Sequence, residues 1–210
     1  MLPNVQIVEL NKQCEDKESF LRICKRDLKL IYENNEESKK FTLCSVERDK
    51  NDAVAIVAYT GNKILLRSCI RPALKFGNFN ALNEDNQGHH FEIPAGLIEL
   101  DEIGIDGIFK AGSRELYEET GYDIPYTEFR FLGKRTFPAV GMSSERIFLL
   151  EVDITNHIPK TPITDGHPLE QYGKSILMDI NEIKNKIKDG EIFDSKTEIG
   201  IYRFLGKHEK

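Results

Sequence analysis

The sequence lacks the features that mark several large classes of protein. It has no excess of positive charge, since its formal net charge is −6 and its pI is about 5.5, so the basic footprint of a nucleic-acid-binding protein is absent. No apolar run approaches the roughly 18 residues of a membrane span, and the first residues do not form a signal-peptide pattern. We therefore expect a cytoplasmic protein that binds neither nucleic acid nor membranes.

Cysteine is scarce and shows no metal-binding or redox spacing. There is no CxxC pair and no accompanying histidine pattern. We expect four reduced thiols, buried or partly exposed. These thiols are Cys14, Cys24, Cys44 and Cys69.

The 210 residues are enough for one large domain preceded by a smaller piece. Residues 1–50 contain strand-like runs at 5–10, 28–32 and 41–46, the last two joined by a polar turn. They predict a small antiparallel β segment, although part of it could be helical. Residues 51–210 form the main domain in this interpretation.

The main domain begins with a predicted hairpin, in which strands at 52–59 and 63–69 flank the turn Thr60-Gly61-Asn62. An Asn-rich loop is expected at 75–90. The Ile, Val and Leu runs after the central helix predict further strands, and Asp179 with Glu182 predicts a capped helix that ends near Gly190. This order favours layered helices on a mixed sheet. The later strands are expected at 129–136, 145–153 and 175–178, and a last helix at 194–205.

The most informative stretch is residues 96–122, GLIELDEIGIDGIFKAGSRELYEETGY. On a helix, Glu115, Glu118 and Glu119 fall within an arc of about 100°. Phe109, Leu116 and Thr120 point elsewhere and can face a core. Carboxylates on one arc repel each other, and a hard divalent cation such as Mg²⁺ resolves the conflict because it prefers carboxylate oxygens. The alternative is a solvated surface helix with several ion pairs.

This stretch resembles the Nudix box, G-x5-E-x7-R-E-U-x-E-E-x-G-U, where U is a bulky apolar residue. Eight residues stand where the pattern requires them: Gly96, Arg114, Glu115, Leu116, Glu118, Glu119, Gly121 and Tyr122.

The match has one departure, because eleven residues rather than seven separate Glu102 from Arg114. Asp106 satisfies the second spacing and Glu102 the first. An insertion of four residues within 100–107, expected in a loop, accounts for both. The sequence leaves open which of the two carboxylates takes the place of the family's glutamate.

The resemblance implies an α/β/α sandwich with a mixed sheet and hydrolysis of a nucleoside diphosphate linked to another group. It implies Mg²⁺, or alternatively Mn²⁺, held by Glu115, Glu119 and Glu118 and by the backbone carbonyl of Ala95. Arg114 lies four residues before Glu118 and is expected to fix its rotamer, which gives Arg114 and Glu118 supporting roles in catalysis.

Features outside the box are similar to ADP-ribose pyrophosphatases and related nucleotide-sugar hydrolases. They are the lead-in at 92–99 (EIPAGLIE), Pro138 sixteen residues after Tyr122, the loop at 141–146 (GMSSER) and the tail at 190–197 (GEIFDSKT). The resemblance implies that Glu145 is a general base or a further metal ligand, although a surface strand-edge glutamate is the simpler alternative. Arg71 could simply pair with a surface carboxylate and Glu92 could be an exposed strand residue, but the resemblance implies substrate binding for a set of four. These are Arg67, Arg71, Glu92 and Gly141.

The resulting prediction is metal-dependent hydrolysis of ADP-ribose or a similar nucleoside diphosphate sugar to a nucleoside monophosphate and a sugar phosphate. One alternative is another Nudix substrate, such as NADH, coenzyme A, a nucleoside triphosphate or GDP-mannose. The other is a non-catalytic domain that senses ADP-ribose. By resemblance, residues 1–50 are also expected to contribute to a homodimer.

Overall fold

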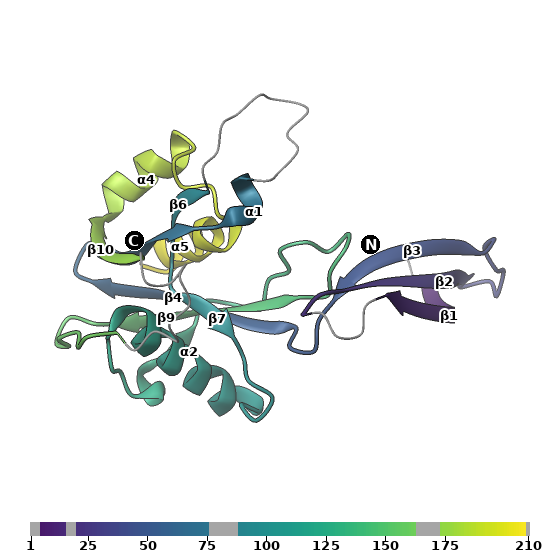
Figure 1. Cartoon of the computed structure of the whole chain (residues 1–210), viewed down its shortest axis with the longest axis horizontal. Coiled ribbons are helices and arrows are strands. Elements are labelled where there is room, and N and C mark those ends of the chain that lie inside the picture. The colour runs from purple at the N-terminus through teal and green to yellow at the C-terminus, as the bar shows by residue number, and fades with distance from the viewer. Residues whose placement is uncertain (1–4, 16–19, 76–87, 163–172, 209–210) are drawn as a thin grey trace. The chain divides into compact units, whose positions relative to one another are not determined.

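The computed structural model describes residues 5–15, 20–75, 88–162 and 173–208, which divide into two compact units (Figure 1). The first unit comprises Met1–Asn51 and Phe137–Glu145, and the second comprises Asp52–Thr136 and Arg146–Lys210. The loop that carries Glu145 is therefore grouped with the N-terminal residues rather than with the glutamate-rich helix.

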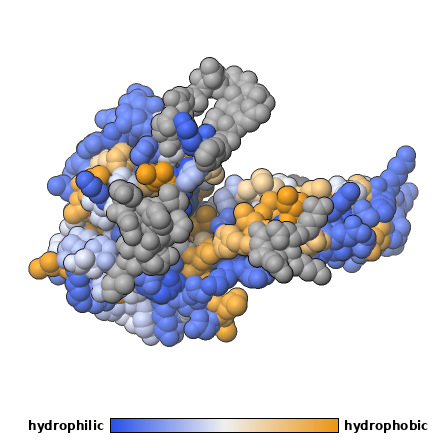
Figure 2. Space-filling view, in the orientation of Figure 1, coloured by the Kyte–Doolittle hydropathy of each residue, from blue (hydrophilic) through white to orange (hydrophobic). Residues whose placement is uncertain are grey.

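The first unit contains a three-stranded antiparallel sheet in the order β1-β2-β3. The strands are β1 (Val5–Glu15), β2 (Arg22–Tyr32) and β3 (Phe41–Glu47). The predicted antiparallel β segment is thus confirmed, with β1 and β2 longer than expected. Apolar and charged surface lie side by side on this unit (Figure 2). Its exposed large apolar residues include Ile7, Leu10, Phe20, Leu21, Ile23, Phe41 and Leu43.

The expectation of four reduced thiols is wrong for one pair. Cys14 of β1 lies directly opposite Cys24 of β2, and a disulfide joins them, with the Cα atoms 4.1 Å apart. Cys44 and Cys69 are free, the first exposed and the second buried. The spacing of cysteines along the chain carries no information about strand register, and it was register that brought this pair together.

The second unit is built on a seven-stranded mixed sheet. Its main order is β10-β5-β4-β9-β8, with β6 paired to β5 and β7 paired to β4; β4 and β9 are parallel and the other pairs antiparallel. The strands are β4 (Asp52–Thr60), β5 (Lys63–Ile70), β6 (His89–Glu92), β7 (Ala95–Leu97), β8 (Arg130–Phe131), β9 (Arg146–Asp153) and β10 (Lys174–Asp179).

Helices cover both faces of this sheet, as Figure 1 shows. Helix α2 (Gly104–Thr120) packs Ala111 and Leu116 against one face, in a cluster with Val54, Ile56 and Leu150. Helices α4 (Ile180–Lys188) and α5 (Ser195–His208) cover the other face, where Ile183, Ile201 and Phe204 meet Val57 and Leu149. The predicted α/β/α sandwich with a mixed sheet is confirmed. In the described ranges the other helices are short: α1 (Pro72–Lys75) and the 3₁₀ helix η1 (Tyr126–Glu128).

Two predicted segments differ from the structure. The strand expected at 129–136 shrinks to β8, and only an isolated bridge between Thr136 and Ile147 follows it. Gly133, with φ of 80°, adopts a left-handed conformation that interrupts the strand. The loop was expected at 75–90, but strand β6 begins at His89, so its last two residues belong to a strand. Residues 76–87 of the expected loop lie outside the described part of the chain.

The predicted cap of α4 is confirmed, because the Asp179 side chain accepts a hydrogen bond from the backbone N–H of Asn181. None of the helices in the described ranges combines the length and apolar character that a membrane span requires.

Candidate functional site

Helix α2 is held in place by its apolar side and by glycines. Leu116 and Thr120 are buried, as predicted, and Phe109 packs against the same cluster. A Cβ at Gly112 would lie 2.6 Å from a methyl carbon of Leu150, so the helix lies directly on the sheet. Gly121 ends the helix with φ of 79° and donates its N–H to the carbonyl of Tyr117. Glu115 and Glu119 lie beside this packed side of the helix and face β7.

Strand β7 and the glutamates of α2 are in direct contact. The backbone N–H of Ala95 donates to Oε2 of Glu119 at 3.0 Å. A Cβ at Gly96 would lie only 2.0–2.2 Å from the carboxyl atoms of Glu115, so this position has room for the carboxylate only because it is glycine. The structure therefore brings together three of the predicted metal-binding residues from two distant segments of the chain.

Arg114 organises the remaining carboxylates of this cluster. Its Nε and Nη2 donate to the two oxygens of Glu102 at 3.0 Å each, a bidentate pair. Its Nη1 donates to Glu115 at 2.7 Å and to Glu118 at 3.2 Å, and Nη2 also reaches the carbonyl of Leu97 at 2.9 Å. The predicted contact between Arg114 and Glu118 is present, and it is one of four made by the same guanidinium.

The structure places Glu102, and not Asp106, in the Arg114 cluster. Glu102 also accepts a hydrogen bond from the backbone N–H of Glu99, whereas Asp106 is exposed in the first turn of α2. Of the range 100–107 in which the insertion was expected, residues 100–103 precede the helix and residues 104–107 form the first turn of α2. The expected loop therefore covers only the first half of this range.

Arg67 of β5 approaches the cluster from the sheet. Its guanidinium forms an ion pair with Glu119, and its side chain is only 5% exposed. Its Nε is buried without a hydrogen-bond partner among the described residues. Burial raises the pKa of Glu119 to about 7, despite the nearby charge of Arg67, and burial also raises the pKa of Glu115.

These properties fit a divalent cation. Burial disfavours the charged form of a carboxylate, and a nearby cation stabilises that charged form. Carboxylate oxygens are also the ligands that Mg²⁺ prefers. Within the described ranges, however, no three carboxylates of this cluster have ligand oxygens all within 4.8 Å of one another. The side chains turn instead to Arg114 and Arg67. Glu115, Glu118 and Glu119 are the residues that would hold the ion, after their carboxylates turn toward it.

A second charged cluster surrounds Glu92 at the end of β6. The Glu92 carboxylate is 3% exposed and contacts Arg71 at 2.5 Å, Lys196 at 2.6 Å and His90 at 3.4 Å. Burial alone would raise the pKa of Glu92, but the hydrogen bond from His90 and the charges of Lys196 and Arg71 hold it well below its usual range. Glu92 is therefore an enclosed anion, whereas the side chain of Arg71 is 52% exposed.

The remaining predicted residues, Gly141 and Glu145, belong to the first unit. Glu145 forms an ion pair with Arg48, whose guanidinium also lies over the ring of Phe20. The loop is attached to β3 by a hydrogen bond from the N–H of Val46 to the carbonyl of Met142 at 2.7 Å. No pattern in the sequence pointed to Arg48 as the partner of Glu145.

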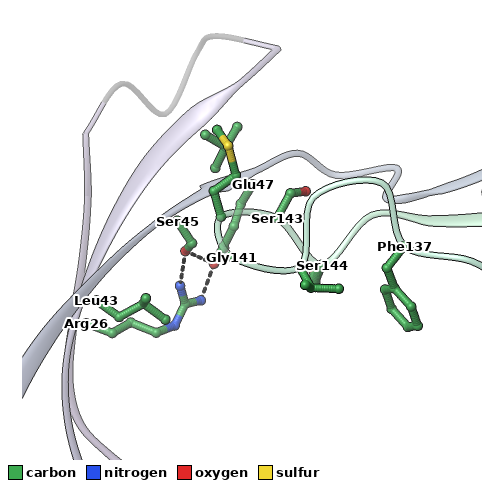
Figure 3. Close-up of a pocket in the computed structure, with 11 residues that line it drawn as sticks. Arg26, Leu43, Ser45, Glu47, Phe137, Gly141, Ser143 and Ser144 are labelled. Atoms are coloured by element: carbon green, nitrogen blue, oxygen red, sulfur yellow. Dashed lines mark hydrogen bonds and ion pairs between the residues drawn. The ribbon is translucent and has the colours of Figure 1, made fainter. Parts of the chain in front are cut away.

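Gly141 lines a cavity of about 490 Å³ within the first unit (Figure 3). In this cavity Arg26 donates to Ser45 at 2.7 Å and pairs with Glu47, beside the apolar side chains of Leu43 and Phe137. None of the glutamates of α2 contributes to its lining. The cavity and the carboxylate cluster are thus separate features.

Comparison with known proteins gives a match in structure. No family model matches the chain, and no curated protein matches it. A solved structure of an ADP compounds hydrolase is similar, with a TM-score of 0.71 and 14% sequence identity over 97% of this chain and 96% of that one. At this identity the likeness establishes the fold alone, an α/β/α sandwich with an additional small sheet.

Proposed function

We propose that the protein is a Mg²⁺-dependent hydrolase of ADP-ribose or a related nucleoside diphosphate sugar. The observation that supports this best is the contact of Glu115 and Glu119 with β7, together with Arg114 bound to three carboxylates. In a surface helix with simple ion pairs, the glutamates would point to solvent, and no glycine would be needed at position 96 to make room for the carboxyl group of Glu115.

In the proposed reaction the oxygen of a water molecule attacks one phosphorus of the diphosphate. The bond from that phosphorus to the bridging oxygen breaks, which gives a nucleoside monophosphate and a sugar phosphate. When bound by Glu115, Glu118 and Glu119, Mg²⁺ supplies charge neutralisation and a water of lowered pKa.

The residues of the chain hold and orient the reactants. Arg114 keeps Glu115 and Glu118 on one side of α2, and Gly96 leaves space for the first of them. The exposed guanidinium of Arg71 binds a phosphate oxygen of the substrate. Glu145 accepts the proton of the attacking water, a role that rests on the resemblance.

Release of AMP from ADP-ribose in the presence of Mg²⁺ tests the proposal. Glu119→Gln should lower kcat/KM at least about 100-fold, because it removes a charged ligand while keeping the size of the side chain. Glu182→Gln, at an exposed position on α4, serves as the matched control and should leave the rate unchanged. Equal rates for wild type and Glu119→Gln would show that the metal assignment is wrong.

The choice of substrate requires a panel at equal concentration, with NADH, coenzyme A, GDP-mannose and a nucleoside triphosphate beside ADP-ribose. Preference for the triphosphate would contradict the nucleotide-sugar proposal and leave the fold unaffected. Tight binding of ADP-ribose without AMP release would favour a non-catalytic sensor.

A further inference from the structure

The buried carboxylate of Glu92 is held at both of its oxygens. Oε1 accepts from Arg71, whereas Oε2 accepts from Lys196 and lies 3.4 Å from His90. A carboxylate bound at one oxygen can rotate about its terminal torsion, but partners on both oxygens fix the orientation of its plane. The groups that hold Oε2 therefore also determine the position in which Oε1 accepts the hydrogen bond from Arg71.

Arg71 is the only charged side chain of this group with a large exposed surface. Its side chain is 52% exposed, compared with 3% for His90 and 15% for Lys196. Its backbone is also fixed, since its N–H donates to the carbonyl of Gly88 at 2.8 Å. Gly88 has φ of 83°, and a Cβ there would lie 2.7 Å from the carbonyl oxygen of Arg71, so glycine is required for this contact.

Lys196 is anchored where α5 begins. Its Nζ lies 2.6 Å from Glu92 and 3.0 Å from Asp194. Asp194 accepts hydrogen bonds from the backbone N–H and the hydroxyl of Thr197. The hydroxyl oxygen of Thr197 in turn accepts from the backbone N–H of Ile93, the residue after Glu92. The start of α5 is thus attached to the end of β6 by one charged and one neutral contact.

We propose that Lys196 is a positioning residue that acts through Glu92 to orient the guanidinium of Arg71 toward an anionic group of the substrate. The inference rests on the proposed function, which gives Arg71 a phosphate to bind. Without Lys196, Oε2 of Glu92 keeps only the longer contact with His90 among the described residues, so the carboxylate is less firmly held and can rotate and draw the guanidinium of Arg71 inward. The sequence pointed to this segment only as part of the tail at 190–197.

A purely structural role for Lys196 would predict a loss of stability alone, and Thr197 offers the matched control for that case. Thr197→Val removes the acceptor for the N–H of Ile93 and the hydroxyl hydrogen bond to Asp194, but it keeps the backbone hydrogen bond to Asp194 and both ion pairs of Lys196. It should lower the Tm and leave the KM for ADP-ribose unchanged.

Steady-state kinetics of the Lys196→Met variant tests the proposal. We expect KM for ADP-ribose to rise about tenfold or more, with kcat within about twofold of wild type, by analogy with the cost of removing groups that orient ligands. Lys196→Arg should restore most of the lost affinity because it keeps the charge. An unchanged KM in Lys196→Met, or an equal rise in Thr197→Val, would overturn the proposal.

A second measurement separates this inference from the proposed function. If the wild-type protein releases no AMP from ADP-ribose, the proposed activity fails, and the Kd for inorganic pyrophosphate with Mg²⁺ becomes the readout. A tenfold weaker Kd in Lys196→Met, but not in Thr197→Val, would still support the positioning role. Equal Kd values for wild type and Lys196→Met would overturn it.

Discussion

At the scale of single residues, the charged groups of the second unit are arranged in connected sets rather than in isolated pairs. Arg114 contacts three carboxylates, and the Glu92 carboxylate contacts two cations and an imidazole. Arg67 and Glu92 lie directly opposite each other in the β5–β6 pair, yet Arg67 forms its ion pair with Glu119 and Glu92 forms one with Arg71. Each set therefore depends on partners from several elements.

The Glu92 set should make stability depend on pH in a defined direction. Because the folded-state pKa of Glu92 is lowered from 4.5, its contribution is complete above about pH 4.5 and is lost as the pH falls below that value. Glu92→Gln should cost about 3 kcal/mol of unfolding free energy at pH 7, the low end for breaking a buried pair, because Arg71 remains half exposed and Lys196 keeps Asp194.

Urea unfolding of wild type and Glu92→Gln at pH 7 and at pH 3 measures this effect. The difference between the two proteins should shrink at the lower pH, because below about pH 4.5 the unfolded wild-type chain takes up a proton at Glu92 while the folded protein still holds the carboxylate charged. A constant difference at both values would contradict the assignment of the charge to Glu92.

At the scale of elements, the contact between β7 and α2 is the feature on which the candidate site depends. The strand is only three residues long, and its central glycine lies against the carboxyl group of Glu115. A short strand with a bare backbone lets a helix approach closely enough for side-chain carboxylates to reach the strand's N–H groups.

Gly96→Ala tests this contact. The added methyl group would overlap the carboxyl atoms of Glu115, so Glu115 must move, and we expect kcat/KM to fall by about 100-fold. Gly206→Ala on α5 has open space around its Cβ and should keep full activity, with stability equal or slightly higher. Retention of full activity by Gly96→Ala would show that the position of Glu115 does not matter for the reaction.

At the scale of the whole molecule, the described residues of the first unit leave many apolar side chains of its sheet exposed to solvent. Three strands rarely form a stable unit without a packed face, and this one exposes several large apolar side chains. We therefore retain the proposal, made by resemblance, that a second copy of the chain covers this surface. The disulfide between Cys14 and Cys24 ties β1 to β2 within it.

Light scattering on the purified protein tests the dimer, whose mass should be twice the 24.1 kDa of the chain. Ile7→Lys, at a position that is 65% exposed, should shift the mass to that of a monomer because it places a charge in the contact. A monomeric wild-type protein at micromolar concentration would contradict the proposal.

The sequence by itself determined the features that depend on local pattern. The spacing of Glu115, Glu118 and Glu119 placed them on one side of a helix, and the turn around Gly61 with its flanking apolar runs specified the first hairpin. Helical and strand periods are properties of neighbouring residues, so these predictions needed no knowledge of the fold.

Only the tertiary structure decided which distant groups meet. It chose Glu102 over Asp106 as the partner of Arg114, joined Cys14 to Cys24, and enclosed Glu92 between Arg71 and Lys196. The last contact spans 104 positions of the chain. Such pairings follow from strand register and from the packing of helices on the sheet. Register and packing depend on the hydrophobic core as a whole, so no short stretch of sequence determines them.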